Sequence, residues 1–205
     1  LHWSFWVALP LAGLAAAAYA VVIGIPLLRL RGHYFAIATL GVAEGTREVV
    51  INLDGLTGGG GGITVPTVGA AAATKYLGND GFYLVYLALA VLALLITGLV
   101  SRSKFGFAMR AIHQDEDAAA AVGINTTRTK VLTFALSGLL TGLVGATYAF
   151  QQVTIYPERL FDVEITVLMV VMVVIGGSGT VLGPIIGAVA LQFLSEWLRQ
   201  NYTTV

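Results

Sequence analysis

The sequence predicts an all-α protein that crosses a membrane several times, as a polytopic transmembrane helical bundle. Of its 205 residues, 57% are hydrophobic and 11% are charged, and the mean hydropathy is +0.85. Soluble domains average roughly 45–50% apolar and ~25% charged residues. Several uncharged runs reach the length of about 20 residues that a helix needs to cross the hydrocarbon core of a bilayer. Composition and run length therefore both indicate an integral membrane protein surrounded by lipid.

Charge and cysteine content exclude several classes of function. The chain holds 11 basic and 11 acidic residues, so its net charge of zero gives no electrostatic basis for binding nucleic acid. Without cysteine it has no disulfide and no thiolate metal site. Its histidines, His2, His33 and His113, match no metal-binding spacing, and no Gly-x-Ser-x-Gly nucleophile motif occurs. We therefore predict no catalytic residue, no metal, no cofactor and no enzyme activity.

The first segment, Phe5 to Leu28, is 24 residues long and carries no charge, which makes it a clear span. Arg29 and Arg31 follow it directly. Lys and Arg next to a span favour the cytoplasmic side, so this end of the helix is predicted to be cytoplasmic.

The second segment, residues 34–51, is a weaker span because Glu44, Arg47 and Glu48 interrupt it. If its helix begins near Tyr34, Glu44 lies about 15 Å along it, close to the bilayer midplane. An ionisable residue at that depth marks a functional site by default. The structural alternative is that Glu44 pairs with Arg47 one turn on and faces a neighbouring helix. Both interpretations stay open at this point.

Residues 52–80 are predicted to form a loop, and residues 81–100 a second clear span. The loop contains five consecutive glycines, Gly58 to Gly62, which have maximal backbone freedom. A phosphate-binding loop needs a Lys-Ser/Thr pair after its glycines, whereas Ile63-Thr64 follows here. The run is therefore predicted to be a flexible turn.

Residues 101–130 form the one long polar segment of the chain. They hold eight of its 22 Asp, Glu, Lys and Arg residues, between two uncharged apolar runs. Arg102, Lys104 and Arg110 favour the cytoplasmic side for this segment, as Arg29 does for the end of the first span. Two crossings must then lie between these basic clusters, so the weak second segment has to span and the loop at residues 52–80 is external.

The polar segment is predicted to contain a short helix. Asp115 suits the N-cap, and Glu116 places negative charge at the positive end of the helix dipole. Gly123 suits the left-handed position after the helix, with Ile124 as the hydrophobic residue that follows it. Asn125 then caps the next helix. This compact unit either docks onto a partner protein or is a solvated loop with an incidental helical turn.

Residues 131–150 form the third clear span. It carries Gly138, Gly142, Gly145 and Ala146, and the four-residue spacing of the small residues allows another helix to approach closely.

Residues 165–195 carry no charge and would extend about 46 Å as one helix, too long for one upright span and short for two. We predict a short helix at 164–175, a glycine break, and a helix from 181 to 198. Short, glycine-interrupted helices are typical of transport pathways. The candidate pathway and helix-break residues are Glu44, Gly176, Gly177, Gly179 and Pro184.

Four groups of residues, in order along the chain, resemble signatures of the LivM-type permeases, which are membrane subunits of bacterial ABC importers for branched-chain amino acids. They are Arg29 to Gly41, Leu56 to Gly59 with Gly62-Ile63, the residues between Phe105 and Asn125, and Gly176 to Thr180 with Gly183-Pro184. The chain departs from that family at His33, where an acidic or small residue is common, and in its all-glycine external motif, where a polar residue is common.

The resemblance implies one transmembrane permease domain over residues 1–205, with further membrane segments before and after it, so an excerpt of a longer protein is expected. It implies an importer of the bacterial inner membrane, built from two such permeases, two ATPase subunits and a periplasmic binding protein. Residues 101–130 would be the cytoplasmic coupling loop, whose movement by the ATPases switches the membrane helices between outward and inward states. The expected ATPase-coupling residues are Arg110, Asp115, Glu116, Ala119, Gly123 and Ile124.

The implied function is uptake of branched-chain or related hydrophobic amino acids, with ATP hydrolysed by the partner chains. Importers of urea, amides and aromatic amino acids share much of the pattern. The alternative is an ion-coupled secondary transporter of small polar solutes, motivated by Glu44 and by the broken helix at residues 176–184. Dependence of uptake on ATP separates the two.

Overall fold

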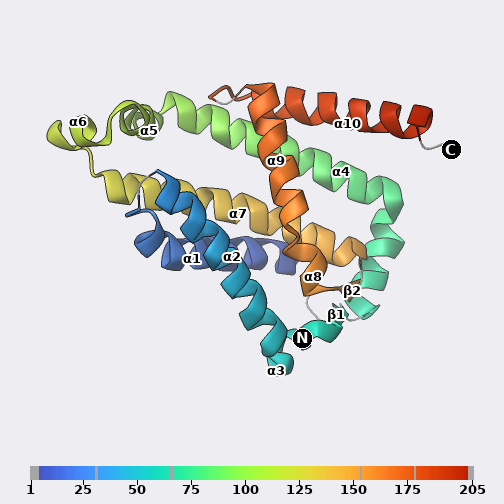
Figure 1. Ribbon diagram of the computed structural model, residues 1–205. Coiled ribbons are helices and arrows are strands. Elements are labelled where there is room, and N and C mark those ends of the chain that lie inside the picture. Colours follow the sequence, from blue (N-terminus) through green and yellow to red (C-terminus); the bar gives the residue numbers. More distant parts are fainter. Residues whose placement is uncertain (1–4, 31, 65–66, 153, 178, 203–205) are drawn as a thin grey trace. The chain divides into compact units, whose positions relative to one another are not determined.

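The computed structural model describes residues 5–30, 32–64, 67–152, 154–177 and 179–202, with only the backbone for Leu56, residues 67–79 and Tyr202 (Figure 1). The chain divides into two compact units, Leu1–Phe161 and Asp162–Val205. Both units are built almost entirely of helices, which confirms the all-α prediction.

The first unit contains the longest helices and a pair of short strands. Its elements are α1 (Phe5–Leu27), α2 (His33–Asn52), α3 (Asp54–Thr57), the 3₁₀ turn η1 (Gly59–Gly61), β1 (Ile63–Thr64), α4 (Thr67–Arg102), α5 (Lys104–Gln114), α6 (Glu116–Ala121), α7 (Thr126–Gln152), β2 (Thr154–Ile155) and α8 (Pro157–Leu160).

Three helical stretches in the described part of the chain are long and apolar enough to cross a membrane. They are Phe5–Leu27, Asp80–Arg102 and Thr126–Gln152, and they match the three clear spans expected from the sequence. Many of their apolar side chains face outward; Val22, for example, is 70% exposed. Such surfaces suit lipid, whereas a soluble monomer rarely exposes large continuous apolar patches.

Helices α1 and α7 pack closely because small residues face each other along both. A Cβ added to Gly142 would lie 2.6 Å from Ala16 Cβ, and one added to Gly138 would lie 2.8 Å from Ala20 Cβ. Glycine is therefore needed at both positions, as the spacing predicted. At Gly145 no described atom of a neighbouring segment lies within 4 Å of an added Cβ, so this glycine lies outside the contact.

One end of the first unit is closed by three phenylalanines and a small sheet. The Phe5 ring of α1 packs edge-on against Phe150 of α7, at 5.2 Å between centroids, and against Phe82 of α4, at 6.4 Å. Strands β1 and β2 pair antiparallel, with Ile63 opposite Ile155. The sheet therefore joins the turn that follows α2 to the turn that follows α7.

The prediction of a loop over residues 52–80 is wrong for its second half. Helix α4 begins at Thr67 and runs without a break to Arg102. Ala70 to Ala73 are strong helix formers, and a helix that has nucleated extends at low cost through the turn-favouring residues 78–81. Local helix propensity thus outweighs the turn signals that suggested a loop.

The glycine run forms a compact turn whose backbone requires glycine. Gly58 and Gly62 have φ angles of 66° and 76°, in the region that L side chains rarely adopt. A Cβ at Gly58 would lie 2.4 Å from Gly62 O, and one at Gly62 would lie 2.4 Å from Ile155 O. The run therefore forms a turn, as predicted, and this turn fits tightly against the strand pair; its flexibility stays a prediction.

The polar segment and the end of α1 lie at the other end of the first unit. Leu28 lines the same cavity as Met109 of α5 and Lys130 of α7, which places Arg29 and the polar segment at one end, in agreement with the orientation argument. Helix α2 begins at this end, where Phe35 lines a cavity with Lys130, and it also contacts η1 and α8, so it extends across the unit (Figure 1). Arg31 lies outside the described residues.

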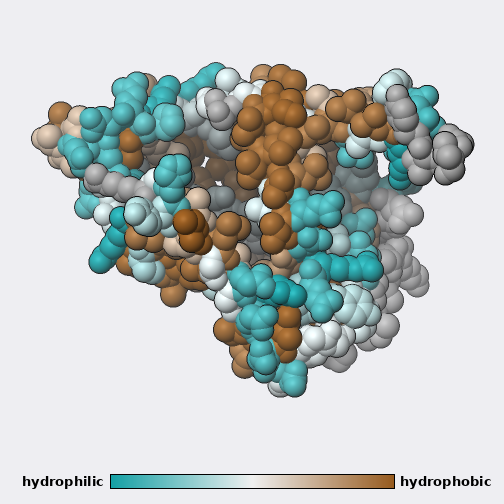
Figure 2. Space-filling view, in the orientation of Figure 1, coloured by the Kyte–Doolittle hydropathy of each residue, from teal (hydrophilic) through white to brown (hydrophobic). Residues whose placement is uncertain are grey.

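The second unit is a pair of helices, α9 (Val163–Gly176) and α10 (Gly183–Tyr202). They agree with the predicted helices at 164–175 and 181–198. Helix α9 has hydrophobic side chains along its length (Figure 2), including Val174 at 64% exposed and Met169 at 61%.

Candidate functional site

The polar segment between α4 and α7 folds as two successive helices, of which the sequence analysis anticipated only the second. Helix α5 begins at Ser103, whose Oγ accepts a hydrogen bond from Gly106 N at 3.3 Å. A Cβ at Gly106 would lie 2.2 Å from Val100 O, so glycine permits the sharp turn out of α4. The serine N-cap and the apolar spacing of Phe105, Met109 and Ile112 were the signals that could have revealed α5.

Helix α6 is capped at both ends as predicted. Asp115 Oδ1 accepts hydrogen bonds from the backbone N–H groups of Asp117 and Ala118, both at 2.9 Å. At the other end Gly123 has a φ of 91°, and Ile124 N donates to Ala119 O at 3.1 Å. This is the Schellman arrangement, in which glycine adopts the left-handed conformation and the next residue bonds back to the helix.

The following helix, α7, is capped in the same local manner. Asn125 Oδ1 accepts a hydrogen bond from Arg128 N at 2.9 Å. Because caps fix both ends of α6 and the start of α7, the chain direction is set at three points within about a dozen residues. The unit formed by α5 and α6 is therefore an ordered projection and not an extended polar loop.

Replacing Asp115 by alanine is expected to loosen α6, because two backbone N–H groups at its start lose their acceptor. We expect a loss of about 1 kcal/mol in local stability, measured as faster amide hydrogen exchange at Asp117 and Ala118. Asp115→Asn keeps a side-chain oxygen and is expected to exchange like the wild type. Equal exchange in the alanine variant and the wild type would contradict the role of this cap.

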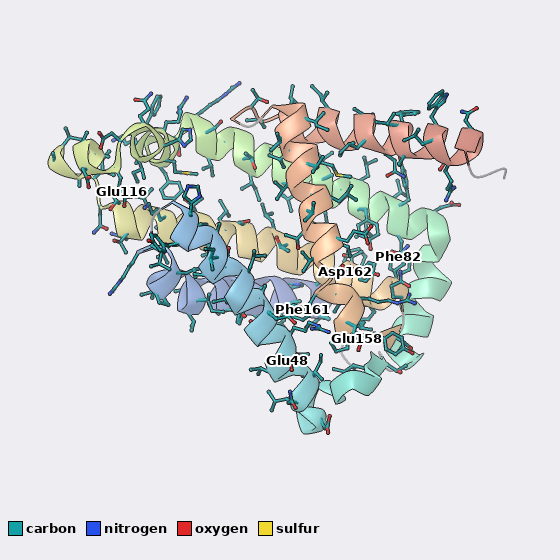
Figure 3. All side chains as sticks on the ribbon, viewed as in Figure 1. Glu48, Phe82, Glu116, Glu158, Phe161 and Asp162 are labelled. Atoms are coloured by element: carbon teal, nitrogen blue, oxygen red, sulfur yellow. The ribbon has the colours of Figure 1, made fainter. Side chains whose placement is uncertain are left out.

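Two interactions tie the projection to its neighbours. Arg110 Nη2 donates to Ser101 O at 2.8 Å, and the guanidinium lies 4.5 Å from the centroid of the Phe107 ring. Glu116 lies at the start of α6 (Figure 3), and its Oε2 is 2.6 Å from Lys130 Nζ on α7. The first contact holds α5 against the end of α4, and the second holds α6 against α7.

The six residues expected to couple to a partner differ in exposure. Arg110, Asp115 and Gly123 are exposed, whereas Glu116 and Ile124 are partly buried. Ala119 is only 3% exposed, so its side chain supports α6 from within and does not reach the surface. Val122, which no sequence pattern marked, is 78% exposed and presents an apolar side chain beside the Schellman turn.

Glu44, the ionisable residue predicted near the midplane, pairs within its own helix. Its Oε1 accepts a hydrogen bond from Arg47 Nη1 at 2.5 Å, and Arg47 also lies 3.9 Å from Glu48 Oε1. Two residues after Glu44 on the same helix, Thr46 hydrogen-bonds to Tyr19 of α1. The pairing expected by the structural alternative is present, and a role for Glu44 in a pathway stays a prediction.

The other candidate pathway residues all lie in the second unit, around the break between α9 and α10. Gly177 and Gly179 have φ angles of 96° and 101°, which end α9 and reverse the chain. Thr180 Oγ1 donates to Gly177 O at 3.1 Å and accepts from Gly183 N at 3.0 Å. Pro184 occupies the first turn of α10, where its missing N–H leaves no helix hydrogen bond unmade.

The two helices of this unit approach at backbone distance. A Cβ at Gly187 would lie 1.8 Å from Met172 O, and one at Gly176 would lie 1.8 Å from Gly183 O. The break is therefore a tight helical hairpin that depends on glycine on both sides. In the part of the chain that the structure describes, no group of three or more His, Asp or Glu side chains could hold a metal ion; His2 lies outside that part.

Comparison with known proteins identifies the family. A family model described as "Branched-chain amino acid transport system / permease component" matches residues 1–204. The high-affinity branched-chain amino acid transport system permease protein LivM of Salmonella typhimurium is 35% identical over 95% of this chain and 51% of that protein. LivM of Escherichia coli is 33% identical over the same shares.

A xylose transport system permease protein, XylH of Haemophilus influenzae, is also similar, with 33% identity over 59% of this chain and 34% of that protein. No solved structure matches the chain significantly. The chain spans about half the length of the LivM proteins. The extent of the family match and the identity to two LivM proteins show that the chain belongs to the family of branched-chain amino acid transport system permease components.

Proposed function

We propose that this chain is part of the membrane-spanning permease subunit of an ABC importer in a bacterial inner membrane. The subunit translocates branched-chain or related hydrophobic amino acids, and ATP is hydrolysed by partner subunits. The observation that carries this proposal is the α5–α6 projection. It is capped at both ends, bonded to α4 and α7, and placed at the end of the first unit that also holds Arg29. A rigid polar projection on the cytoplasmic side suits a motor protein that pushes on it.

The assembly contains a second homologous permease, two ATPase subunits and a periplasmic binding protein. The strand pair and α8 lie at the opposite end of the first unit from the projection (Figure 1). This arrangement supports their assignment to the periplasmic side, as the surface on which the binding protein docks. Among the relatives, the two LivM proteins cover far more of the chain than the xylose permease does. This coverage favours amino acids over sugars as the substrate class.

The test is reconstitution of the full-length protein with its ATPases, second permease and binding protein in proteoliposomes. Uptake of radiolabelled leucine, isoleucine or valine is expected to require ATP and to persist when ionophores collapse the ion gradients. A catalytically inactive ATPase provides the matched control and should abolish uptake. Uptake that is driven by an ion gradient without the ATPases would contradict the proposal and support a secondary transporter.

A further inference from the structure

The ion pair between Glu116 and Lys130 joins α6 to α7 across the turn that connects them. Glu116 is the first residue of α6 and Lys130 lies in the second turn of α7, and their charged atoms are 2.6 Å apart. The two side chains are 24% and 22% exposed. A charge-assisted hydrogen bond of this length, partly shielded from water, is among the stronger polar contacts in proteins.

The pair borders open space. Two cavities, of about 580 and 450 Å³, each have Glu116, Lys130 and Leu28 in their lining. Met109 and Phe134 line the larger one together with the pair. The ion pair therefore links α6 directly to α7 at a point that borders open space.

Helix α7, which carries Lys130, is packed closely against α1. Helix α7 packs against α1 along Gly138 and Gly142, where an added Cβ would meet α1 at less than 3 Å. Close-packed helices move as rigid elements and do not deform gradually. A displacement of α6 that reaches Lys130 would therefore move α1 and α7 together.

We propose that Glu116 and Lys130 are a positioning pair that transmits the displacement of α6 to the α1–α7 helix pair. This role rests on the proposed function, and it separates the residues that bind the ATPase from those that transmit its movement. The exposed face of the projection binds the ATPase, and the ion pair passes the movement on. Without the pair, the ATPase still binds and hydrolyses ATP, but each ATP hydrolysed displaces the membrane helices α1 and α7 less.

The experiment compares Lys130→Met, Lys130→Arg and Glu116→Gln with the double charge swap E116K/K130E, each in the full-length protein reconstituted with its partners. ATPase association, ATP hydrolysis and leucine uptake are measured on the same preparations. We expect the two charge-removing variants to retain association while leucine moved per ATP falls about fivefold or more, the lower range of known coupling between sites. Lys130→Arg and the charge swap should recover most of that ratio.

Arg128→Met is the matched control, since Arg128 is an exposed basic residue in the same part of α7, and its ratio should not change. An unchanged ratio in Lys130→Met and Glu116→Gln would overturn the role of the pair, and so would loss of ATPase association. A charge swap that associates but transports no better than the single variants would also overturn it, even if a single variant fails to fold. Uptake by the wild type that does not depend on ATP would instead overturn the proposed function.

Discussion

Gly187→Ala is expected to destabilise the α9–α10 hairpin by about 3 kcal/mol, at the upper end of the cost of overpacking. The added Cβ would lie 1.8 Å from Met172 O and 2.9 Å from Gly176 N. Both obstacles are backbone atoms, so no change of side-chain rotamer relieves the clash, and the helices must separate. We expect a lower thermal unfolding temperature in detergent and faster amide exchange along α9 and α10.

Gly145→Ala is the matched control, because it is the same substitution inside a helix. No described atom of another segment lies within 4 Å of the new Cβ, so alanine is expected to be neutral or to stabilise α7 by about 0.5–1 kcal/mol. If Gly187→Ala and Gly145→Ala unfold at the same temperature, the close approach of α9 and α10 is wrong.

Ala119→Asp is expected to unfold α6 locally and to abolish both ATPase association and transport. Ala119 is 3% exposed and accepts the hydrogen bond that closes the Schellman turn. Even in its protonated form, a carboxyl forced into this site without a partner costs about 2 kcal/mol or more. A helix of six residues, Glu116–Ala121, has little intrinsic stability to offset this cost.

The next residue offers a direct comparison. Ala120 is exposed, so Ala120→Asp adds the same charge without burying it and should leave the exchange protection of α6 intact. Hydrogen exchange read by mass spectrometry over residues 115–125 separates the two variants. Wild-type protection in Ala119→Asp would show that Ala119 does not support α6 from within.

Features that depend on local backbone chemistry were predictable from the sequence. The cap at Asp115, the left-handed Gly123 and the cap at Asn125 need only a few neighbouring residues, and all three are present in the structure. The close approach of another helix at Gly138 and Gly142 was also predictable, because a four-residue spacing places both glycines on one face of a helix.

Features that depend on distant partners were not predictable. Nothing in the sequence pairs Glu116 with Lys130, which lie 14 positions apart across a turn, or joins Ile63 to Ile155 in a strand pair. The prediction of a loop over 52–80 is wrong in its second half, because the helix-forming run Ala70 to Ala73 outweighs the turn-favouring residues that follow it and α4 continues through both. The role of Glu44 could not be decided from the sequence. A glutamate that pairs with Arg47 in its own helix and a glutamate that acts in a pathway give the same sequence pattern.

On the proposed function, the α5–α6 projection faces the cytoplasm and is contacted there by an ATPase. The sequence contains no cysteine, so a single cysteine at the 78% exposed position Val122 can be labelled without background once any cysteine elsewhere in the full-length protein is replaced. Val122→Cys should react with a membrane-impermeant maleimide in inside-out vesicles and not in right-side-out vesicles, and bound ATPase subunits should slow the reaction. Labelling from the periplasmic side would contradict the account.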